Sequence, residues 1–301
     1  MGCQERLVSV GRSVQLLVRE FQPRDATDRT CIVVHGAAEH GGRHQHIADR
    51  LCRAGWRVLV PDLRGHGRST GRPMHLLRFG QYVDDLARIY DAWNLVPEST
   101  AQIGYSLGGL VTTRFAQRHP GRCQAMALAC PLLGLRVHVP TWIYASGRAL
   151  SLTYPWKRFS SVLNPADVTR CPISIAERQS DPLYRHGVTA GWYFAVQRAI
   201  AAAWNEAREV SNPILMVQSG EDRVVDGDAG RHWLEQVASR DVEFQELPGH
   251  FHEWHFEPTW AKTTDSIGQW LGSRLAPSMI APSTIAVPSM EMLVTDQRRA
   301  E

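Results

Sequence analysis

Short β-branched segments alternate along this chain with longer amphipathic segments, and this alternation limits the available folds more than any other feature. Strand-like patterns occur at residues 13–20, 31–34, 57–61, 101–104, 125–129, 214–218 and 242–247. Helix-like patterns lie between them at 45–54, 79–95, 107–119, 228–239 and 259–273. Strand–helix–strand units form right-handed crossovers, which build parallel sheets. We therefore predict an α/β fold with a mostly parallel central sheet and helices on both faces.

The alternation is interrupted between residues 132 and 211, where helix-like pieces rich in Trp, Tyr and Leu follow one another without a clear strand. We interpret 132–211 as an inserted helical cap on a core made of residues 1–131 and 212–275. The aromatic side chains of the insertion could line a ligand site or only fill the core of the lobe. Residues 276–301 are rich in Pro and Ser, so we predict a flexible tail.

The composition is that of an ordinary globular protein and excludes several classes. The chain has 301 residues, 44% of them hydrophobic and 21% charged, and its formal charge of +3 is too small to indicate a nucleic-acid partner. The six cysteines lie far apart without a C-x-x-C pair, so we expect reduced thiols. The N-terminal MGCQERLVSV lacks the apolar segment of a signal peptide, and no uncharged run is long enough to span a membrane. The sequence therefore predicts a cytoplasmic protein.

The strand-like segment 101–104 leads directly into GYSLGG, a G-x-S-x-G motif centred on Ser106. Between a strand and a helix, this motif places the serine hydroxyl on a sharp turn at the carboxyl end of the strand. Glycines at positions 104 and 108 leave room for the turn and for the approaching helix. Ser106 is therefore the candidate nucleophile of a hydrolase, and the alternative is a serine in an ordinary surface loop.

A serine hydroxyl needs a base within hydrogen-bond reach, and the base needs a third group that orients it. On a sheet of this kind the partners follow in the order Ser, acid, His. Asp222 lies just beyond the sixth predicted strand, and a histidine-rich segment lies just beyond the seventh. Because the carboxyl ends of parallel strands meet at one edge of the sheet, we expect these groups near Ser106. The carboxylates that compete with Asp222 are Glu221, Asp226 and Asp228.

The segment HGAAEHGG at residues 35–42 directly follows another predicted strand. A turn of small residues here lets the backbone N–H of Ala37 point at a developing oxyanion, and the N–H of Leu107 at the start of a helix is the second candidate donor. His35 and His40 in the same turn could be metal ligands or structural residues. No cluster of acids or cysteines accompanies them, which favours a structural role.

Three histidines, His250, His252 and His255, lie close together in LPGHFHEWHFE. Their spacing is similar to the ligand run of the metallo-β-lactamase-like hydrolases, but Trp254 occupies the position of that run's aspartate. In a serine mechanism only one of the three can contact both the nucleophile and the acid. The Pro-Gly pair before His250 turns the chain, which places His252 deeper in the crevice. We predict neither a metal nor an organic cofactor.

Six segments together carry a resemblance to a known family: HGAAEHGGRHQHIADRL, VLVPDLRGHGRSTG, GYSLGG, SDPL, SGEDRVVD and GHFHEWHFE. Over roughly residues 13–273 the chain resembles the monoacylglycerol lipase and lysophospholipase branch of the α/β-hydrolases. The resemblance implies the α/β-hydrolase fold, a catalytic triad and an oxyanion hole. By position, the triad is Ser106, Asp222 and His252, and the oxyanion donors are the N–H groups of Ala37 and Leu107.

The resemblance also implies a role for the insertion, because in this family the cap forms the acyl-binding tunnel and contacts lipid surfaces. The candidate residues that line or border the acyl site are Trp142, Trp156, Trp192 and Phe194. Two positions depart from the family pattern. Tyr105 stands where a His usually precedes the nucleophile, and His250 stands where a small residue is common. The first weakens the specific lipase assignment, and the second places another histidine beside the base.

We therefore expect a serine hydrolase that cleaves carboxylic esters through an acyl-enzyme, with monoacylglycerols or lysophospholipids as substrates. We expect transient contact with membrane surfaces through the cap. A general carboxylesterase or arylesterase and a proline-type serine aminopeptidase are the alternatives, because the same triad on the same fold serves these reactions and the cap decides among them. A noncatalytic small-ligand receptor on this fold is the alternative from another class.

Overall fold

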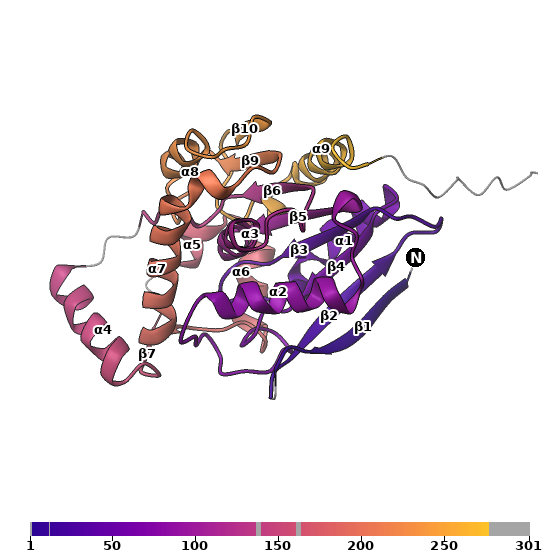
Figure 1. Ribbon diagram of the computed structural model, residues 1–301. Helices are drawn as coiled ribbons and strands as arrows, with labels where there is room; N and C mark the ends of the chain where they lie inside the picture. Colours follow the sequence, from indigo (N-terminus) through magenta and orange to yellow (C-terminus); the bar gives the residue numbers. More distant parts are fainter. Residues whose placement is uncertain (1, 12, 137–139, 161–163, 277–301) are drawn as a thin grey trace, which may run out of the picture.

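An eight-stranded sheet forms the centre of the computed structural model, which describes residues 2–11, 13–136, 140–160 and 164–276 (Figure 1). The order of the strands across the sheet is β1-β2-β4-β3-β5-β6-β9-β10. These strands are β1 (Gly2–Ser9), β2 (Gln15–Gln22), β3 (Thr30–Val34), β4 (Arg57–Pro61), β5 (Thr100–Tyr105), β6 (Ala125–Ala129), β9 (Ile214–Ser219) and β10 (Val242–Leu247). The predicted tail at 276–301 lies outside the described residues except for Ala276.

The sheet is parallel from β4 to β10, and only the pairs β1–β2 and β2–β4 are antiparallel. The predicted mostly parallel sheet is thus confirmed. Strand β1 was not predicted, because it lies at the edge of the sheet and only Val8 within it is buried. Such a strand shows no apolar face in the sequence.

Helices cover both faces of the sheet (Figure 1). The crossover from β3 to β4 moves toward one edge of the sheet, whereas the crossovers from β4 to β5 and from β5 to β6 move toward the other. Because all of these crossovers are right-handed, their helices must lie on opposite faces. On one face α1 packs with α9, and on the other α2 packs with α3. The helices of the core are α1 (Gln45–Arg53), α2 (Gly80–Ala92), α3 (Leu107–Arg118), α8 (Gly227–Leu234) and α9 (Trp260–Gly272).

The central strands form the core, since every residue of β3, β5, β6 and β9 is buried. Parallel strands covered on both faces require apolar side chains at nearly every position, which explains runs such as TCIVV and AMALA. The carboxyl ends of these strands all reach the same edge of the sheet. Side chains that follow β5, β9 and β10 are therefore brought together there.

Between β6 and β9 the chain forms α4 (Thr141–Thr153), β7 (Arg158–Phe159), α5 (Pro165–Val168), α6 (Pro172–Ser180), β8 (Val188–Thr189) and α7 (Ala190–Asn205). Helix α7 packs against α3 of the core and against α4. Helix α4 has no buried residue and lies beyond α7, away from the central sheet (Figure 1). Among the described residues, no helix combines the length and the apolar character that crossing a bilayer requires.

Candidate active site

The GYSLGG turn between β5 and α3 has the geometry that its glycines require. Ser106 has φ 52° and ψ −114°, a conformation that L-residues rarely adopt. A Cβ atom at position 104 would lie 2.6 Å from the Gly108 carbonyl oxygen, and one at position 108 would lie 2.0 Å from the Val34 carbonyl oxygen. No side chain fits at either position. The strained backbone of Ser106 is thus held by the close approach of α3 to β3 and β5, which is typical of functional sites.

The structure brings Ser106, Asp222 and His252 together at the predicted edge of the sheet. His252 Nδ1 lies 2.7 Å from Asp222 Oδ2, and His252 Nε2 lies 3.0 Å from Ser106 Oγ. The side chain of Asp222 accepts, so Nδ1 carries the proton and Nε2 is left to accept the serine hydroxyl proton. All three residues are at least 94% buried, with exposed fractions of 6%, 2% and 3% in the order given. The imidazole is therefore oriented with its basic nitrogen on the serine.

Asp222 is fixed by its own backbone as well as by His252. Its Oδ1 accepts the N–H groups of Val224 and Val225, both at 2.9 Å, and its Oδ2 also accepts from Gln218 Nε2 at 3.2 Å. Burial opposes ionisation of the carboxyl, but the charge and hydrogen bond of His252 and the two backbone donors outweigh it and lower the pKa of Asp222. The carboxylate is thus ionised at neutral pH.

The neighbouring carboxylates have other positions. Asp226 caps α8 by accepting the N–H of Asp228 at 3.2 Å, and Glu221 and Asp228 are exposed. Among the described residues, Asp222 alone of these four acids hydrogen-bonds to His252. The structure thus brings Asp222, and none of the three neighbouring acids, to His252; its role as the triad acid stays a prediction.

The two predicted oxyanion donors follow neighbouring strands. Ala37 lies in the turn after β3, and Leu107 is the first residue of α3 after β5, while β3 and β5 pair directly. Gly36 N–H is taken by Glu39 Oε1 at 2.7 Å, whereas the N–H groups of Ala37 and Leu107 donate to no acceptor within the described parts of the chain. The predicted oxyanion hole requires two N–H donors without an acceptor in the protein.

His35 hydrogen-bonds to the backbone on both sides of its ring and so holds the turn after β3 in place. Its Nδ1 donates to the Gly36 carbonyl at 2.7 Å, and its Nε2 accepts the N–H of Leu63 at 2.9 Å. Burial and the neighbouring His66 lower the pKa of His35 to about 3, so the ring stays neutral. Both ring nitrogens are thus used by the backbone, as a structural role requires.

The side chains of His250 and His255 do not lie between Ser106 and Asp222. His250 binds the Pro248 carbonyl at 3.0 Å and the Thr259 hydroxyl at 2.6 Å. His255 lies on the short helix η4 (Trp254–Phe256), is 1% exposed and stacks on His44 with a ring distance of 4.6 Å. Neither ring hydrogen-bonds to the triad in the part of the chain that the structure describes. Of the three histidines in the segment, only His252 contacts both partners.

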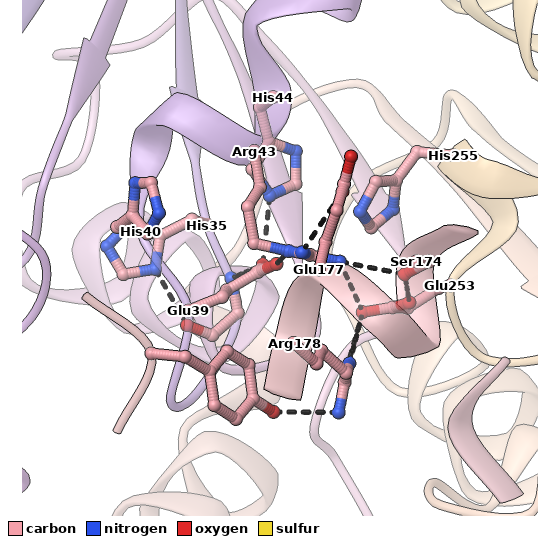
Figure 2. Close-up of polar contacts among 12 residues, drawn as sticks. His35, Glu39, His40, Arg43, His44, Ser174, Glu177, Arg178, Glu253 and His255 are labelled. Carbon is pink, nitrogen blue, oxygen red and sulfur yellow. Dashed lines mark hydrogen bonds and ion pairs between the residues drawn. The ribbon is translucent and has the colours of Figure 1, made fainter. Parts of the chain in front are cut away.

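A buried network of charged side chains forms around Arg43 and Glu253 (Figure 2). Glu253 directly follows His252 in the chain. Arg43 lies in the segment between β3 and α1. Its guanidinium nitrogens lie 2.8 Å from Ser174 Oγ, 3.4 Å from Glu253 Oε1 and 3.4 Å from Glu39 Oε2. Burial would raise the pKa of Glu39, but its hydrogen bond and charge interaction with His44, then the charges of His255 and Arg43, hold it well below its usual value. The sequence reasoning did not identify this network. The sequence features that point to the network are the charged residues Glu39 and Arg43 in and beside the glycine-rich turn, and Glu253 directly after His252.

Among the residues that the structure describes, two groups of side chains bring possible metal-ligand atoms within 4.8 Å of one another: Glu39 with His44 and His255, and Cys130 with Asp222 and His252. In the first group the Arg43 guanidinium lies 3.4 Å from Glu39 and opposes a cation, and Glu39 Oε1 already accepts from Gly36. In the second group the donor atoms of the acid and histidine already bond to each other.

The four aromatic residues predicted to line the acyl site differ in exposure. Trp142 on α4 is 73% exposed and Trp156 is 46% exposed. Trp192 is buried, and its indole N–H donates to the Tyr82 hydroxyl at 3.0 Å. Phe194 is buried on α7 and contacts the Tyr144 ring of α4 at 5.1 Å. Their contact with an acyl chain stays a prediction.

The chain is similar to known hydrolases over most of its length. Residues 25–259 match the Hydrolase_4 family, described as serine aminopeptidase, S33. A monoacylglycerol lipase of Mycolicibacterium smegmatis is 31% identical over 81% of this chain and 88% of that protein. Lysophospholipase L2 of Escherichia coli is 29% identical over 76% of each chain. A crystal structure of Paleococcus ferrophilus monoacylglycerol lipase superposes with a TM-score of 0.79 at 25% identity, over 86% of this chain and 99% of that one.

Proposed function

We propose a specific function from one premise: this chain belongs to the Hydrolase_4, serine aminopeptidase S33, family of α/β-hydrolases. It is an ester hydrolase of the type of the monoacylglycerol lipases and lysophospholipases. Our proposal is that it cleaves carboxylic esters of an apolar acyl chain through a covalent acyl-enzyme on Ser106. The observation that carries the proposal is the position of the His252 ring, 3.0 Å from Ser106 Oγ and 2.7 Å from Asp222 Oδ2.

In the first half of the reaction, Ser106 Oγ attacks the carbonyl carbon of the ester while His252 Nε2 takes the hydroxyl proton. The carbonyl oxygen becomes an oxyanion, which the N–H groups of Ala37 and Leu107 stabilise. The C–O bond to the alcohol then breaks, and Nε2 returns its proton to the leaving oxygen. The products of this half-reaction are the free alcohol and a Ser106 acyl ester.

In the second half, water takes the place of the alcohol. His252 Nε2 removes a proton from water as its oxygen attacks the acyl carbon, and the proton returns to Ser106 Oγ when the acyl group leaves as a carboxylic acid. Asp222 stays ionised throughout and stabilises the imidazolium that forms twice in the cycle. Its lowered pKa fits this role.

We assign residues 132–211 to a cap and residues 1–131 with 212–275 to the hydrolase core. Large apolar side chains of the cap are exposed on and beside α4, which supports transient contact with a lipid surface. The exposed residues are Trp142, Ile143, Tyr144, Leu152, Tyr154, Trp156 and Phe159. We infer monoacylglycerols or lysophospholipids as the substrates from the cap and from the named relatives.

A panel of substrates tests this function. We expect purified protein to hydrolyse p-nitrophenyl esters, monoacylglycerols and lysophospholipids, and the ratio of kcat/KM values among them identifies the head group. Selective cleavage of prolyl amides would instead support the aminopeptidase function that the family description names. No turnover and no acylation burst with an activated ester would support a noncatalytic receptor.

A further inference from the structure

The residue that follows the proposed base carries the most enclosed carboxylate beside the site. Glu253 is 0% exposed, and its neighbours in space come mostly from the inserted region (Figure 2). We propose that Glu253 is a positioning residue that couples the docking of α6 to the orientation of His252. The proposal rests on the proposed function, because it takes His252 as the base.

The carboxylate of Glu253 is held by three side chains. Arg178 donates to its Oε1 from both Nε, at 3.1 Å, and Nη2. Ser174 Oγ donates to Oε2 at 2.7 Å, and Arg43 Nη2 lies 3.4 Å from Oε1. Two of these partners, Ser174 and Arg178, are carried by α6. Only Arg43 belongs to the hydrolase core.

The backbone of Glu253 is also bound to the insertion. Its N–H, which belongs to the peptide bond shared with His252, donates at 3.0 Å to the carbonyl of Val168, the last residue of α5. Side chain and backbone are therefore both attached to the segment that runs from α5 to α6. The imidazole of His252 extends from the chain directly before this anchored point.

Because the carboxylate of Glu253 is buried, its loss of partners would be costly. A carboxylate out of contact with water is tolerated only while cations and hydrogen-bond donors compensate it, and removal of one partner is strongly destabilising. If α6 moved away, Glu253 would keep Arg43 but lose Ser174 and both donors of Arg178. The conformation of the loop beside the base is thus stable only with α6 in place. Docking of the insertion and orientation of the base are linked through one residue.

Replacement of the charge without loss of volume tests the coupling. We expect Glu253→Gln to lower kcat for p-nitrophenyl acetate by about 10–100-fold with KM within about threefold, because a small misplacement of a catalytic group has this cost. A short, water-soluble ester does not depend on lipid contact by the cap. An unchanged kcat in a folded Glu253→Gln protein would overturn the proposal.

Two control variants separate positioning from plain stability. Glu177→Gln makes the same chemical change on α6, but Glu177 is half-exposed and lies 3.6 Å from Arg43, so kcat should stay within about twofold. Asp85→Asn breaks the buried ion pair with Arg64, which has no contact with the histidine loop among the described residues, so the protein should lose stability and keep kcat. If Asp85→Asn lowers kcat as much as Glu253→Gln, the effect is structural and the proposal fails.

A double-mutant cycle with Arg178→Gln measures the coupling itself. We expect the double variant to have about the kcat of either single variant, since both remove the same interaction. Additive losses would contradict a shared role. Ser174→Ala removes two neutral-group hydrogen bonds, from Arg43 and to Glu253, and keeps the charges paired. It therefore serves if either charge variant does not fold, with an expected loss of a few-fold in kcat.

The imidazole N–H resonance of His252, assigned by its loss in His252→Ala, gives a readout that needs no turnover. We expect Glu253→Gln to shift or broaden this resonance and Glu177→Gln to leave it in place. If wild-type protein hydrolyses no ester, the proposed function fails, and the resonance still decides the coupling. A resonance that is the same in wild type and Glu253→Gln would overturn it.

Discussion

His252 and His255 lie three residues apart on the same segment, but their ring nitrogens differ in their hydrogen bonding. The His252 ring has a partner on each nitrogen, Asp222 on one side and Ser106 on the other. His255 is equally buried, but neither of its ring nitrogens has a hydrogen-bond partner among the described residues, and it packs against the rings of His44 and Tyr105. Burial, then the charge of His44, lowers the pKa of His255 well below the usual value. The comparison shows that position after β10, rather than the residue type, decides which histidine hydrogen-bonds to both Ser106 and Asp222.

The sharpest way to break this comparison is to remove the group that His252 faces. Ser106→Ala should lower turnover of any ester substrate by about a millionfold, because the members of a triad act as a unit. The backbone conformation of the turn is set by the glycines, so the variant should fold. Esterase assays on a preparation free of contaminating hydrolases measure the loss. More than a trace of activity would remove His252 and Ser106 from the mechanism.

The next largest effect concerns the other partner of His252. Asp222→Asn should lower kcat by about four orders of magnitude, because an amide at this position favours the wrong imidazole tautomer. Asp226→Asn is the matched control, since Asp226 caps α8 and Asn caps a helix about as well as Asp, so stability should change little. A greater loss of kcat in Asp226→Asn would show that the carboxylate assignment is wrong.

The buried, neutral histidines should make the free energy of unfolding depend on pH, and they should have little effect on the pH dependence of kcat. Burial lowers the pKa of His35 to about 3, and burial is also the main cause that lowers His46 and His66 to about 4. The unfolded chain binds protons at these residues below about pH 6.5, whereas the folded chain does not until pH 3–4. The free energy of unfolding should therefore fall as the pH drops from about 6.5 to about 4, by about 1–2 kcal/mol per histidine between pH 7 and 5.

Urea denaturation at pH 7 and 5 measures this loss. His66→Gln should reduce the difference in unfolding free energy between pH 7 and pH 5 by the contribution of one histidine, about 1–2 kcal/mol. His232→Gln, at an exposed position, should leave this difference unchanged. Asp222, whose pKa is lowered, contributes in another window: its stabilisation is complete above about pH 4 and is lost only as the pH falls further. Equal stability at pH 7 and 5 would contradict the neutral state of the buried rings.

The smallest effect is expected at His250, the first histidine of the segment. His250→Ala removes contacts to the Pro248 carbonyl and the Thr259 hydroxyl, which lie away from the triad. It should keep kcat within a few-fold and lower stability by about 1 kcal/mol, the usual loss for a partly exposed hydrogen-bonded side chain. Steady-state kinetics and urea denaturation measure both quantities. An inactive His250→Ala protein with an active His252→Ala protein would reverse the assignment of the base.

The sequence predicts that Ser106, Asp222 and His252 lie close together, because each of them follows a strand. Ser106 comes directly after β5, and Asp222 and His252 lie in the loops that follow β9 and β10. Parallel pairing brings the ends of these strands to one edge of the sheet. The buried network could not be predicted in the same way. Glu253 and Arg178 are 75 residues apart, and no local pattern indicates that a loop after β10 meets a helix of the insertion. Strand β1 was missed because an exposed edge strand has no apolar alternation.

Covalent labelling tests the central claim, the pairing of Ser106 with His252, most directly. Wild-type protein treated with a fluorophosphonate should gain one adduct, mapped by mass spectrometry to the peptide that contains Ser106. The rate of labelling should fall by several orders of magnitude in His252→Ala and stay close to that of wild type in His250→Ala. Labelling of another residue, or an equal rate in wild type and His252→Ala, would contradict the account.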